Sequence, residues 1–307
     1  MSVSSDTKKN WGRWGAEDER GALNLIDESK RLADASAIRT GKMYPLGLPI
    51  QRSGVPVFEY RGPAQRLTLA SQTDEAFWAS FGEAMGIPSD GAGGNEDLLI
   101  FGTHSGTHLD ALCHVFHDGH LYNGFPNSTF GSYGGAARNS IHQVGGVAGR
   151  AVLLDVATHL GVPWLEPTFR ITDAVLEEVR AAQEIEIRPG DILLIRTGWL
   201  DQFFDAQERG LTLSEAQPGI DQSAVDFIDR YDISLVGSDN GAVECLPCDE
   251  TLLSVHIKLL VHRGINLLEF ADLRRLAADG VKEVFLVIAP MKVVGGTGSP
   301  VNPIAIA

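Results

Sequence analysis

The order of its apolar segments limits the folds open to this chain of 307 residues. Short runs rich in leucine, isoleucine and valine, bounded by glycine, proline or aspartate, have the length of strands. They cover residues 98–104, 151–157, 191–198, 233–239 and 284–290. Helical patterns cover residues 27–40, 72–86, 172–183, 221–232 and 270–280. Strands that alternate with helices predict an α/β domain with a mixed or mostly parallel sheet.

Capping residues and turn residues mark where these elements begin and end. Asp27 and Thr172 precede two of the helical patterns and are good N-caps, and Gly41 is the expected end of the first helix. Residues 86–97 and 104–150 are rich in glycine and turn residues. We expect both to form loops, the second wrapped over a site. No break in composition marks a second domain, so the sequence predicts a single domain over 1–307.

The segment FGTHSGTHLDALCHVFHDGH, residues 101–120, holds five of the nine histidines of the chain. Its glycines and threonines disfavour a helix, and alternate side chains of an extended strand share one face. His104, His108 and Asp110 would then point to the same side. Gly106 would leave room on that side for a ligand close to the backbone. The pattern therefore predicts a metal site built on a strand.

Two imidazoles and one carboxylate suit Zn²⁺, Mn²⁺ or Fe²⁺. Three protein ligands leave a position for water, which is typical of a catalytic site. His114, four residues further on, is a candidate general acid and base or a partner of a ligand. His117 and His120 follow in a loop, where we expect the rim of a pocket or the surface.

Other interpretations of these motifs stay open. Non-haem iron oxygenases also use two histidines and a carboxylate, although their ligands usually come from separated strands. The C-x-x-C pair of Cys245 and Cys248 lacks a second pair, which favours incidental thiols. The turn GGTGSP, residues 295–300, lacks the lysine of a phosphate loop, which favours a structural turn.

The formal net charge of −15 argues against nucleic acid and anionic membranes as partners. No apolar run approaches the length of a membrane span, and the segment MSVSSDTKKNWGRWG lacks the apolar core of a signal peptide. We therefore expect a cytoplasmic protein without nucleic acid or membrane partners.

The stretch THSGTHLDALCHVF resembles the H-x-G-T-H-x-D-x₃-H signature of the metal-dependent cyclase-type hydrolases, a family that includes kynurenine formamidases and isatin hydrolases. Further stretches look like the longer branch of this family; they are residues 10–26, 118–124, 187–199, 235–244, 256–269 and 289–303. The resemblance implies a swivelling β/β/α fold, in which helices flank a mixed, barrel-like sheet. It also implies a homodimer or a homotetramer.

Carried over to this sequence, the family motif implies a divalent metal, Zn²⁺ or Mn²⁺, held by His104, His108 and Asp110. His256 and Glu269 match the ligands of a second metal that Asp110 would bridge. Their separation differs by one residue from that in the shorter formamidases, so one or two metals per subunit both remain open. His114 matches the catalytic histidine. His262 would lie off the His256 face of a helix, as an exposed side chain.

These features together predict a hydrolase in which a metal-activated water opens an amide, a cyclic amide or a lactone. A cyclase or dehydratase on the same core and a metal-dependent binding protein without turnover are the alternatives. The substrate is expected to be a small aromatic or cyclic molecule. The candidates for an apolar pocket wall, for which core packing is the alternative, are Trp11, Trp14, Phe101, Phe116 and Trp199.

Two further regions carry expectations. An N-terminal arm, about residues 1–26, is predicted to pack on a partner subunit. Asp239 and Glu244 follow a predicted strand end, where α/β proteins tend to place their sites. A role in polar loop structure is the favoured interpretation for this acidic pair.

Overall fold

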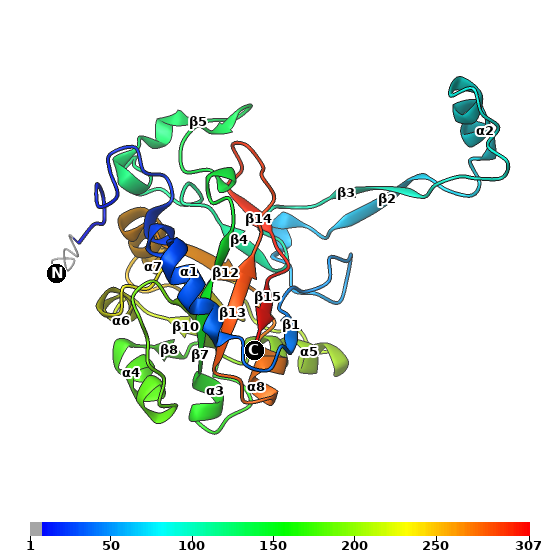
Figure 1. Cartoon of the computed structure of the whole chain (residues 1–307). Coiled ribbons are helices and arrows are strands. Elements are labelled where there is room, and N and C mark those ends of the chain that lie inside the picture. Colours follow the sequence, from blue (N-terminus) through cyan, green and yellow to red (C-terminus); the bar gives the residue numbers. More distant parts are fainter. Residues whose placement is uncertain (1–7) are drawn as a thin grey trace.

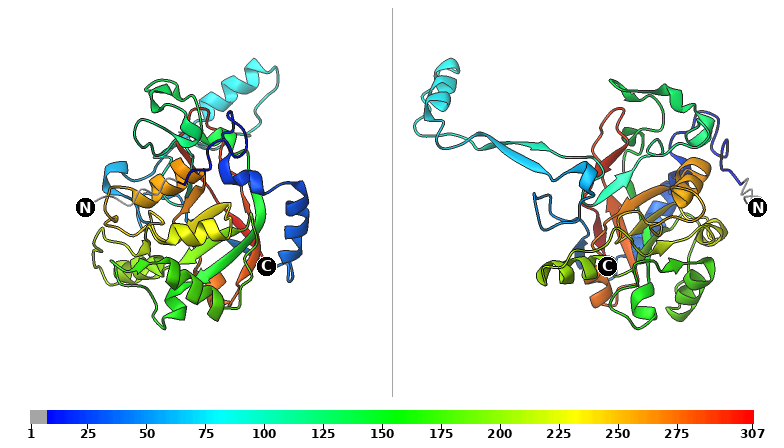
Figure 2. Two further views of the ribbon diagram at one scale, coloured as in Figure 1. Left: turned by 90° about the vertical axis from the view of Figure 1, so that its left-hand side faces the viewer. Right: turned by 180° about the vertical axis from the view of Figure 1, so that it is seen from behind.

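Most strands of the body form one mixed sheet that curls into a half-barrel, with helices against it (Figures 1 and 2). The computed structural model describes residues 8–307. In this part of the chain the sheet has nine strands in the order β1-β15-β13-β7-β9-β11-β12-β4-β14. Their bounds are β1 Met43–Pro45, β4 His108–Asp110, β7 Val147–Asp155, β9 Ile192–Arg196, β11 Leu235–Ser238, β12 Asn266–Glu269, β13 Glu283–Ile288, β14 Gly298–Pro300 and β15 Ile304–Ile306.

The middle of the sheet is parallel and its two sides are antiparallel. Strands β7, β9, β11 and β12 run parallel to one another. Strands β4 and β14 add to one side in antiparallel pairs, and β13, β15 and β1 add to the other. This arrangement confirms the predicted α/β class, with a mixed, barrel-like sheet flanked by helices.

Most positions of the central strands are apolar and buried, because both faces of these strands are covered. Leu193 and Ile195 point into a cluster shared with the helices, whereas Ile192 and Leu194 point into the interior of the curl. The helices of the body are α1 Glu28–Asp34, α3 Val156–His159, α4 Asp173–Ala182, α5 Trp199–Glu208, α6 Ala224–Arg230, α7 Ser254–His256 and α8 Arg274–Ala278. A π-helix, Ile257–Arg263, continues α7 directly.

The predicted N-caps are confirmed, but the first helix is shorter than predicted. The Asp27 side chain accepts a hydrogen bond from Lys30 N at 2.7 Å, and Thr172 accepts one from Val175 N at 3.3 Å. Helix α1 ends at Asp34 and gives way to a 3-10 turn well before Gly41. Asp34 is buried and binds Arg150 N at 3.0 Å, a tertiary contact that local sequence does not reveal.

A hairpin leaves the body and projects far from it (Figures 1 and 2). It consists of β2 (Gln65–Ala70), α2 (Glu75–Ala84) and β3 (Glu96–Ile100), and among residues 8–307 β2 pairs with β3 alone. We call residues 65–100 the projecting hairpin. The strand predicted over 98–104 is therefore present only up to Ile100, and it belongs to this hairpin and not to the main sheet.

The loop-rich stretch 104–150 contains β4, the start of β7, short 3-10 turns and a small hairpin of β5 (Phe130–Gly131) and β6 (Gly135–Ala136). Two further short strands, β8 (Arg170–Ile171) and β10 (Gly219–Ile220), pair in parallel. In the stretch 8–307, no helix combines the length and the apolar character that a membrane crossing requires.

The described part of the N-terminal segment lies on its own chain. Trp11 Nε1 donates a hydrogen bond to Val261 O at 2.7 Å, and Asn10 N donates to His262 O at 2.9 Å. Residues 1–7 of the predicted N-terminal arm lie outside the described residues. Contact of this arm with a partner subunit, and the single domain over 1–307, stay predictions.

Candidate metal centre

Strand β4 carries two of the expected ligands and lies between β12 and β14. His108 and Asp110 are two residues apart in this strand, so their side chains share a face. The antiparallel register with β12 places Glu269 directly opposite His108. On the other side, Gly298 of β14 lies opposite Asp110. Backbone pairing alone therefore brings together residues from three distant parts of the sequence.

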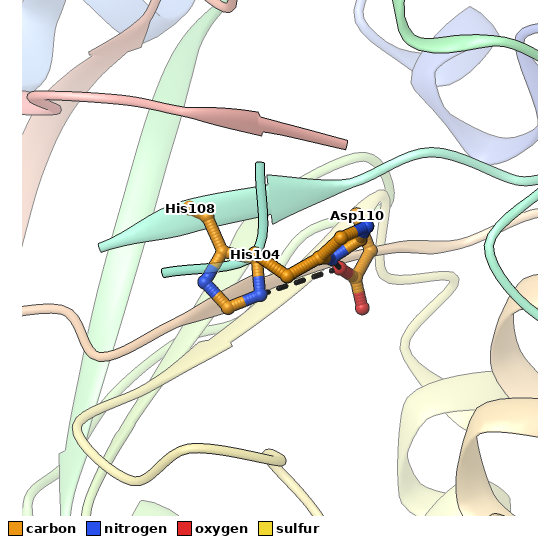
Figure 3. A group of neighbouring side chains, drawn as sticks. All are labelled: His104, His108 and Asp110. Atoms are coloured by element: carbon orange, nitrogen blue, oxygen red, sulfur yellow. Dashed lines mark hydrogen bonds and ion pairs between the residues drawn. The ribbon is translucent and has the colours of Figure 1, made fainter. Parts of the chain in front are cut away.

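His104 reaches the same place from a turn. Ser105 N donates to Gly102 O at 3.1 Å, and Gly106 has φ +63°, a conformation that favours glycine. The prediction that one extended strand runs from His104 to Asp110 is thus wrong, because the chain reverses before β4 begins. The turn still points His104 inward, where its Nδ1 lies 2.7 Å from Asp110 Oδ1 (Figure 3).

Two residues of the glycine-rich turn before β14 fit closely around His104. Thr297 Oγ1 lies 2.9 Å from His104 Nε2. A Cβ atom on Gly298 would lie only 2.5 Å from His104 Cε1, so this position has no room for a side chain. The turn is structural, as predicted, but its role beside His104 was not foreseen. The separation of about 190 residues in the sequence hides it.

His256 and Glu269 complete the cluster. His256 Nε2 lies 3.3 Å from Glu269 Oε1 and 3.8 Å from Asp110 Oδ2. Glu269 Oε2 lies 3.1 Å from His108 Nε2. Among the described residues, two groups have ligand atoms within 4.8 Å of one another, namely His104, His108 and Asp110, and Asp110, His256 and Glu269. Asp110 belongs to both groups, which is the position that a bridging carboxylate requires.

The chemistry of this cluster fits a divalent metal. His108 Nδ1 donates to Gly106 O at 2.8 Å, which directs the lone pair of Nε2 into the cluster. Asp110 Oδ2 is buried and makes no hydrogen bond to any residue within 8–307, and the polar atom facing the buried His108 Nε2 is Glu269 Oε2. Buried polar atoms without partners are costly, and imidazole nitrogens with carboxylate oxygens suit Zn²⁺ or Mn²⁺. The ligand roles remain proposals.

The charges of the cluster depend on one another. Burial raises the pKa of Asp110, but the neighbouring imidazoles of His114, His104 and His108 lower it more strongly, to well below its usual range. Burial alone would lower the pKa of His256, but Glu244 and Glu269 raise it well above the ordinary histidine value. Without a metal, His256 is thus a cation between two carboxylates.

Glu244 holds His256 from the side opposite the cluster. Its buried carboxylate contacts His256 Nδ1 and accepts hydrogen bonds from Ser254 Oγ at 3.2 Å and Val255 N at 3.1 Å. These contacts turn Nε2 of His256 toward Asp110 and Glu269. The sequence interpretation favoured polar loop structure for Glu244. The position of Glu244 after a strand end was the sequence signal for its second role, which is to orient His256.

Asp239, the other member of the acidic pair, anchors the loop before α5. It accepts hydrogen bonds from Thr197 N and Gly198 N, each at 2.8 Å. Burial raises the pKa of this carboxyl to about 6, although the backbone and side-chain hydrogen bonds from Thr197 oppose the rise. For Asp239, these contacts are those of polar loop structure.

His114 lies beside the cluster as a neutral imidazole. Its ring stacks on that of His104 with 3.9 Å between the centroids, and it lies 6.4 Å from the ring of His256. Burial is the main cause that lowers the pKa of His114 to about 4, so at neutral pH the ring can accept a proton. This is the state that a general base requires.

The other histidines of the region lie away from the cluster. His117 is half-buried and His120 is exposed; His120 lies 6.0 Å from the ring of Trp11. His262 was expected to be exposed, but the structure buries it, with 8% of its surface accessible. The expectation assumed an ordinary helix, whereas residues 257–263 form a π-helix packed into the body.

The five aromatic candidates for the pocket wall lie in different environments. Trp199 lines a cavity of about 460 Å³ together with Phe58, Phe203 and Phe270. Of these residues Phe270 lies near the cluster, with its ring centroid 6.4 Å from that of His108. Trp11 and Trp14 pack against the core, Phe101 is half-buried and Phe116 is exposed. Contacts of any of them with a substrate stay predictions.

Comparison with known proteins places this geometry in a family. Residues 44–245 match the model of a family described as "Putative cyclase". The chain is 25% identical over 229 residues to the isatin hydrolase of Roseibium aggregatum, covering 71% of this chain and 77% of that protein.

Two solved structures share the fold. A crystal structure described as a novel cyclase is 32% identical, with a TM-score of 0.85 and full coverage of both chains. A predicted metal-dependent hydrolase from Bacillus stearothermophilus is 18% identical, with a TM-score of 0.53, over 86% of this chain and 97% of that chain.

Metal binding should release protons. A divalent ion needs neutral imidazoles. Burial alone would lower the pKa of both histidines, but Glu269 raises that of His108, and Glu244 and Glu269 raise that of His256, above the ordinary histidine value. We expect metal affinity to rise with pH until both imidazoles are neutral. Calorimetric titration in buffers of different ionisation enthalpy measures the protons released. His256→Gln should release fewer protons, and an affinity independent of pH would contradict this account.

Glu244→Gln should weaken metal binding by about 10- to 100-fold, because outer partners orient ligand imidazoles. Glutamine keeps the size of the side chain but loses the charge that faces His256. Competition with a chromophoric chelator gives the affinity. Glu166→Gln, at an exposed position, is the matched control and should bind metal like the wild type. If both variants bound the metal with equal affinity, Glu244 would not orient a ligand of the metal centre.

Proposed function

The chain belongs to the cyclase family, and we propose that it is a metal-dependent hydrolase that opens an amide, a cyclic amide or a lactone to release a carboxylate. The observation that carries this proposal is the buried cluster centred on Asp110, with the neutral ring of His114 beside it. The similarity to an isatin hydrolase, which is named for its hydrolysis of a cyclic amide, supports the reaction class.

The cluster has ligands for one or two ions. His104, His108 and Asp110 would hold the first, and Asp110, His256 and Glu269 would hold the second, with Zn²⁺ or Mn²⁺ as the ions we propose. A divalent ion at such a site supplies a water of lowered pKa and polarises the carbonyl of a substrate. The protein residues fix the ligand geometry and exclude bulk water from the reacting groups.

His114 is the residue we assign to proton transfer. Its ring is neutral, because burial lowers its pKa to about 4, and its contact with the His104 ring holds it against the cluster. It takes a proton from the attacking water and returns it to the leaving nitrogen or oxygen. His104 positions the His114 ring by stacking, and Thr297 and Gly298 in turn position His104.

The aromatic cavity next to the cluster is the proposed place for the apolar part of the substrate. Trp199 stacks on Phe203 with 5.6 Å between the ring centroids, and Phe270 lies 5.6 Å from Trp199 on the side of His108. A cavity of about 460 Å³ accepts a molecule with one or two small rings. We therefore propose an aromatic or cyclic amide or lactone as substrate.

The alternatives differ in what they require of His114. A metal-dependent binding protein has no use for an acid and base beside its ligands. A cyclase or dehydratase would use the same residues in a different direction of proton transfer. We further propose, from the family resemblance, that the subunits form a homodimer or homotetramer. The cytoplasmic location stays a prediction from the sequence.

Purified protein should contain a divalent metal and should hydrolyse at least one member of a panel of formanilides, isatin, cyclic imides and lactones. Elemental analysis and product detection by liquid chromatography measure the two properties. A chelator should abolish turnover, and added Zn²⁺ or Mn²⁺ should restore it. Turnover and thermal stability that a chelator leaves unchanged would contradict the proposal.

His114→Ala should lower kcat by about 10²- to 10⁴-fold, since positioned acids and bases contribute rate factors of this size. Metal content should stay at the wild-type level, because His114 is not among the proposed ligands. His120→Ala removes an exposed histidine of the same segment and should keep full activity. Full turnover of a metal-loaded His114→Ala variant would exclude the proton-transfer role.

A further inference from the structure

We propose that Gln217 selects the ligand of the aromatic cavity, by donating a hydrogen bond from its Nε2 to the carbonyl oxygen of a neutral ring compound. The inference rests on the function proposed above, because it concerns the cavity assigned there to the apolar part of the substrate. Gln217 lines this cavity together with Trp199 and Phe270, although only 3% of its surface is accessible. A buried amide normally has its hydrogen-bonding groups satisfied by the protein.

The protein satisfies all polar groups of Gln217 except one. The backbone N donates to Leu246 O at 3.0 Å, and the backbone O accepts from Leu246 N at 2.9 Å. The side-chain Oε1 accepts a hydrogen bond from Gly241 N at 2.7 Å. Because a backbone N–H can only donate, this contact fixes which end of the amide is the oxygen. The remaining group is therefore the Nε2 amino group, which is purely a donor.

The Nε2 atom of Gln217 faces the cavity. It has no hydrogen-bond acceptor among residues 8–307, and it is not one of the polar atoms that neighbouring groups enclose completely. An accessible atom on a residue that is otherwise buried faces the space that the residue lines, which here is the cavity of about 460 Å³. A fixed donor in the wall of an apolar pocket is the kind of group that orients a ligand.

Gly241 connects Gln217 to the side of the cavity that lies near the metal cluster. A Cβ atom on Gly241 would lie only 2.3 Å from Phe270 Cζ, so the Phe270 ring rests directly on this stretch of backbone. Phe270 N donates to Asn240 O at 2.9 Å, and the Phe270 ring centroid lies 6.4 Å from that of His108. A carbonyl bound by Nε2 would therefore hold a ring at a fixed place relative to the cluster.

The charges around the cavity favour a neutral ligand. The other polar side chains that line it are exposed; they are Glu59, Gln207, Thr212, Ser214 and Glu215. Two of them are carboxylates, and none of the described residues that line the cavity is a lysine or an arginine. A carboxylate ligand would meet like charges here without a cation to balance it. An amide donor instead suits the oxygen of a ketone, an amide or a lactone.

Acetophenone and α-methylstyrene test this contact, because they have nearly the same shape and only acetophenone carries an acceptor oxygen. Ligand-observed NMR titration of the purified, metal-loaded protein gives the two dissociation constants. Neither compound can be hydrolysed, so the measurement does not depend on turnover. The wild type should bind acetophenone about 3- to 10-fold more tightly than α-methylstyrene, which is the range expected of one net hydrogen bond.

Gln217→Met removes the donor and keeps a side chain of similar length, so this variant should lose the preference for acetophenone. Gln217→Glu retains an acceptor for Gly241 N but replaces Nε2 with an oxygen, and at alkaline pH it should lose the preference as well. The matched control is Gln222→Met, at a half-buried position that does not line the cavity, and it should keep the wild-type preference. Thermal unfolding by circular dichroism checks the fold of each variant.

Equal affinities of the wild type for the two compounds, or no saturable binding of either, would overturn the proposal. A folded Gln217→Met variant that keeps the preference would overturn it too. If Gln217→Met does not fold, Gln217→Glu decides in the same way, because it preserves the contact with Gly241. A preference that depends on Gln217, in a protein that hydrolyses no amide or lactone, would contradict the catalytic proposal alone.

Discussion

The pairing of β4 with its two neighbours is the constraint on which the candidate centre depends. This strand has only three residues, yet it is held by β12 on one side and β14 on the other. The register brings Glu269 opposite His108 and leaves Gly298 next to the ring of His104. A shift of one residue would turn His108 and Asp110 to the other face. On its other side β12 pairs in parallel with β11, which ties it to the middle of the sheet.

Burial of so many ionisable groups is stable only because each is opposed by another. Asp110 and Glu269 lie among the imidazoles of His104, His108 and His256, and Glu244 holds His256 from behind. Such a cluster tolerates the loss of water because charges alternate, and a bound cation suits the atoms left without partners. The same burial keeps His114 neutral. The burial of these groups therefore accounts both for the arrangement of charges in the cluster and for the neutral His114 ring that the proposed proton transfer needs.

The sequence predicted the secondary structure best where local signals were strong. The caps at Asp27 and Thr172 and the apolar runs of β7, β9, β11 and β13 are as expected. It missed α5 and β12. It also extended β3 into the histidine turn, where the chain reverses at Gly106 and His104 contacts Arg61 and Asp110. His262 is buried and not exposed because it lies in a π-helix, for which the sequence has no simple signal.

By itself, the sequence determined which residue types gather at the centre. The spacing of His104, His108, Asp110 and His114 is local, and local spacing is visible in a linear chain. Only the tertiary structure decided how these residues meet His256, Glu269, Glu244 and Gly298. Strand register and turn direction set those distances over more than a hundred residues of intervening chain. It also decided that residues 65–100 leave the body, because only the assembled sheet shows which apolar side chains remain uncovered.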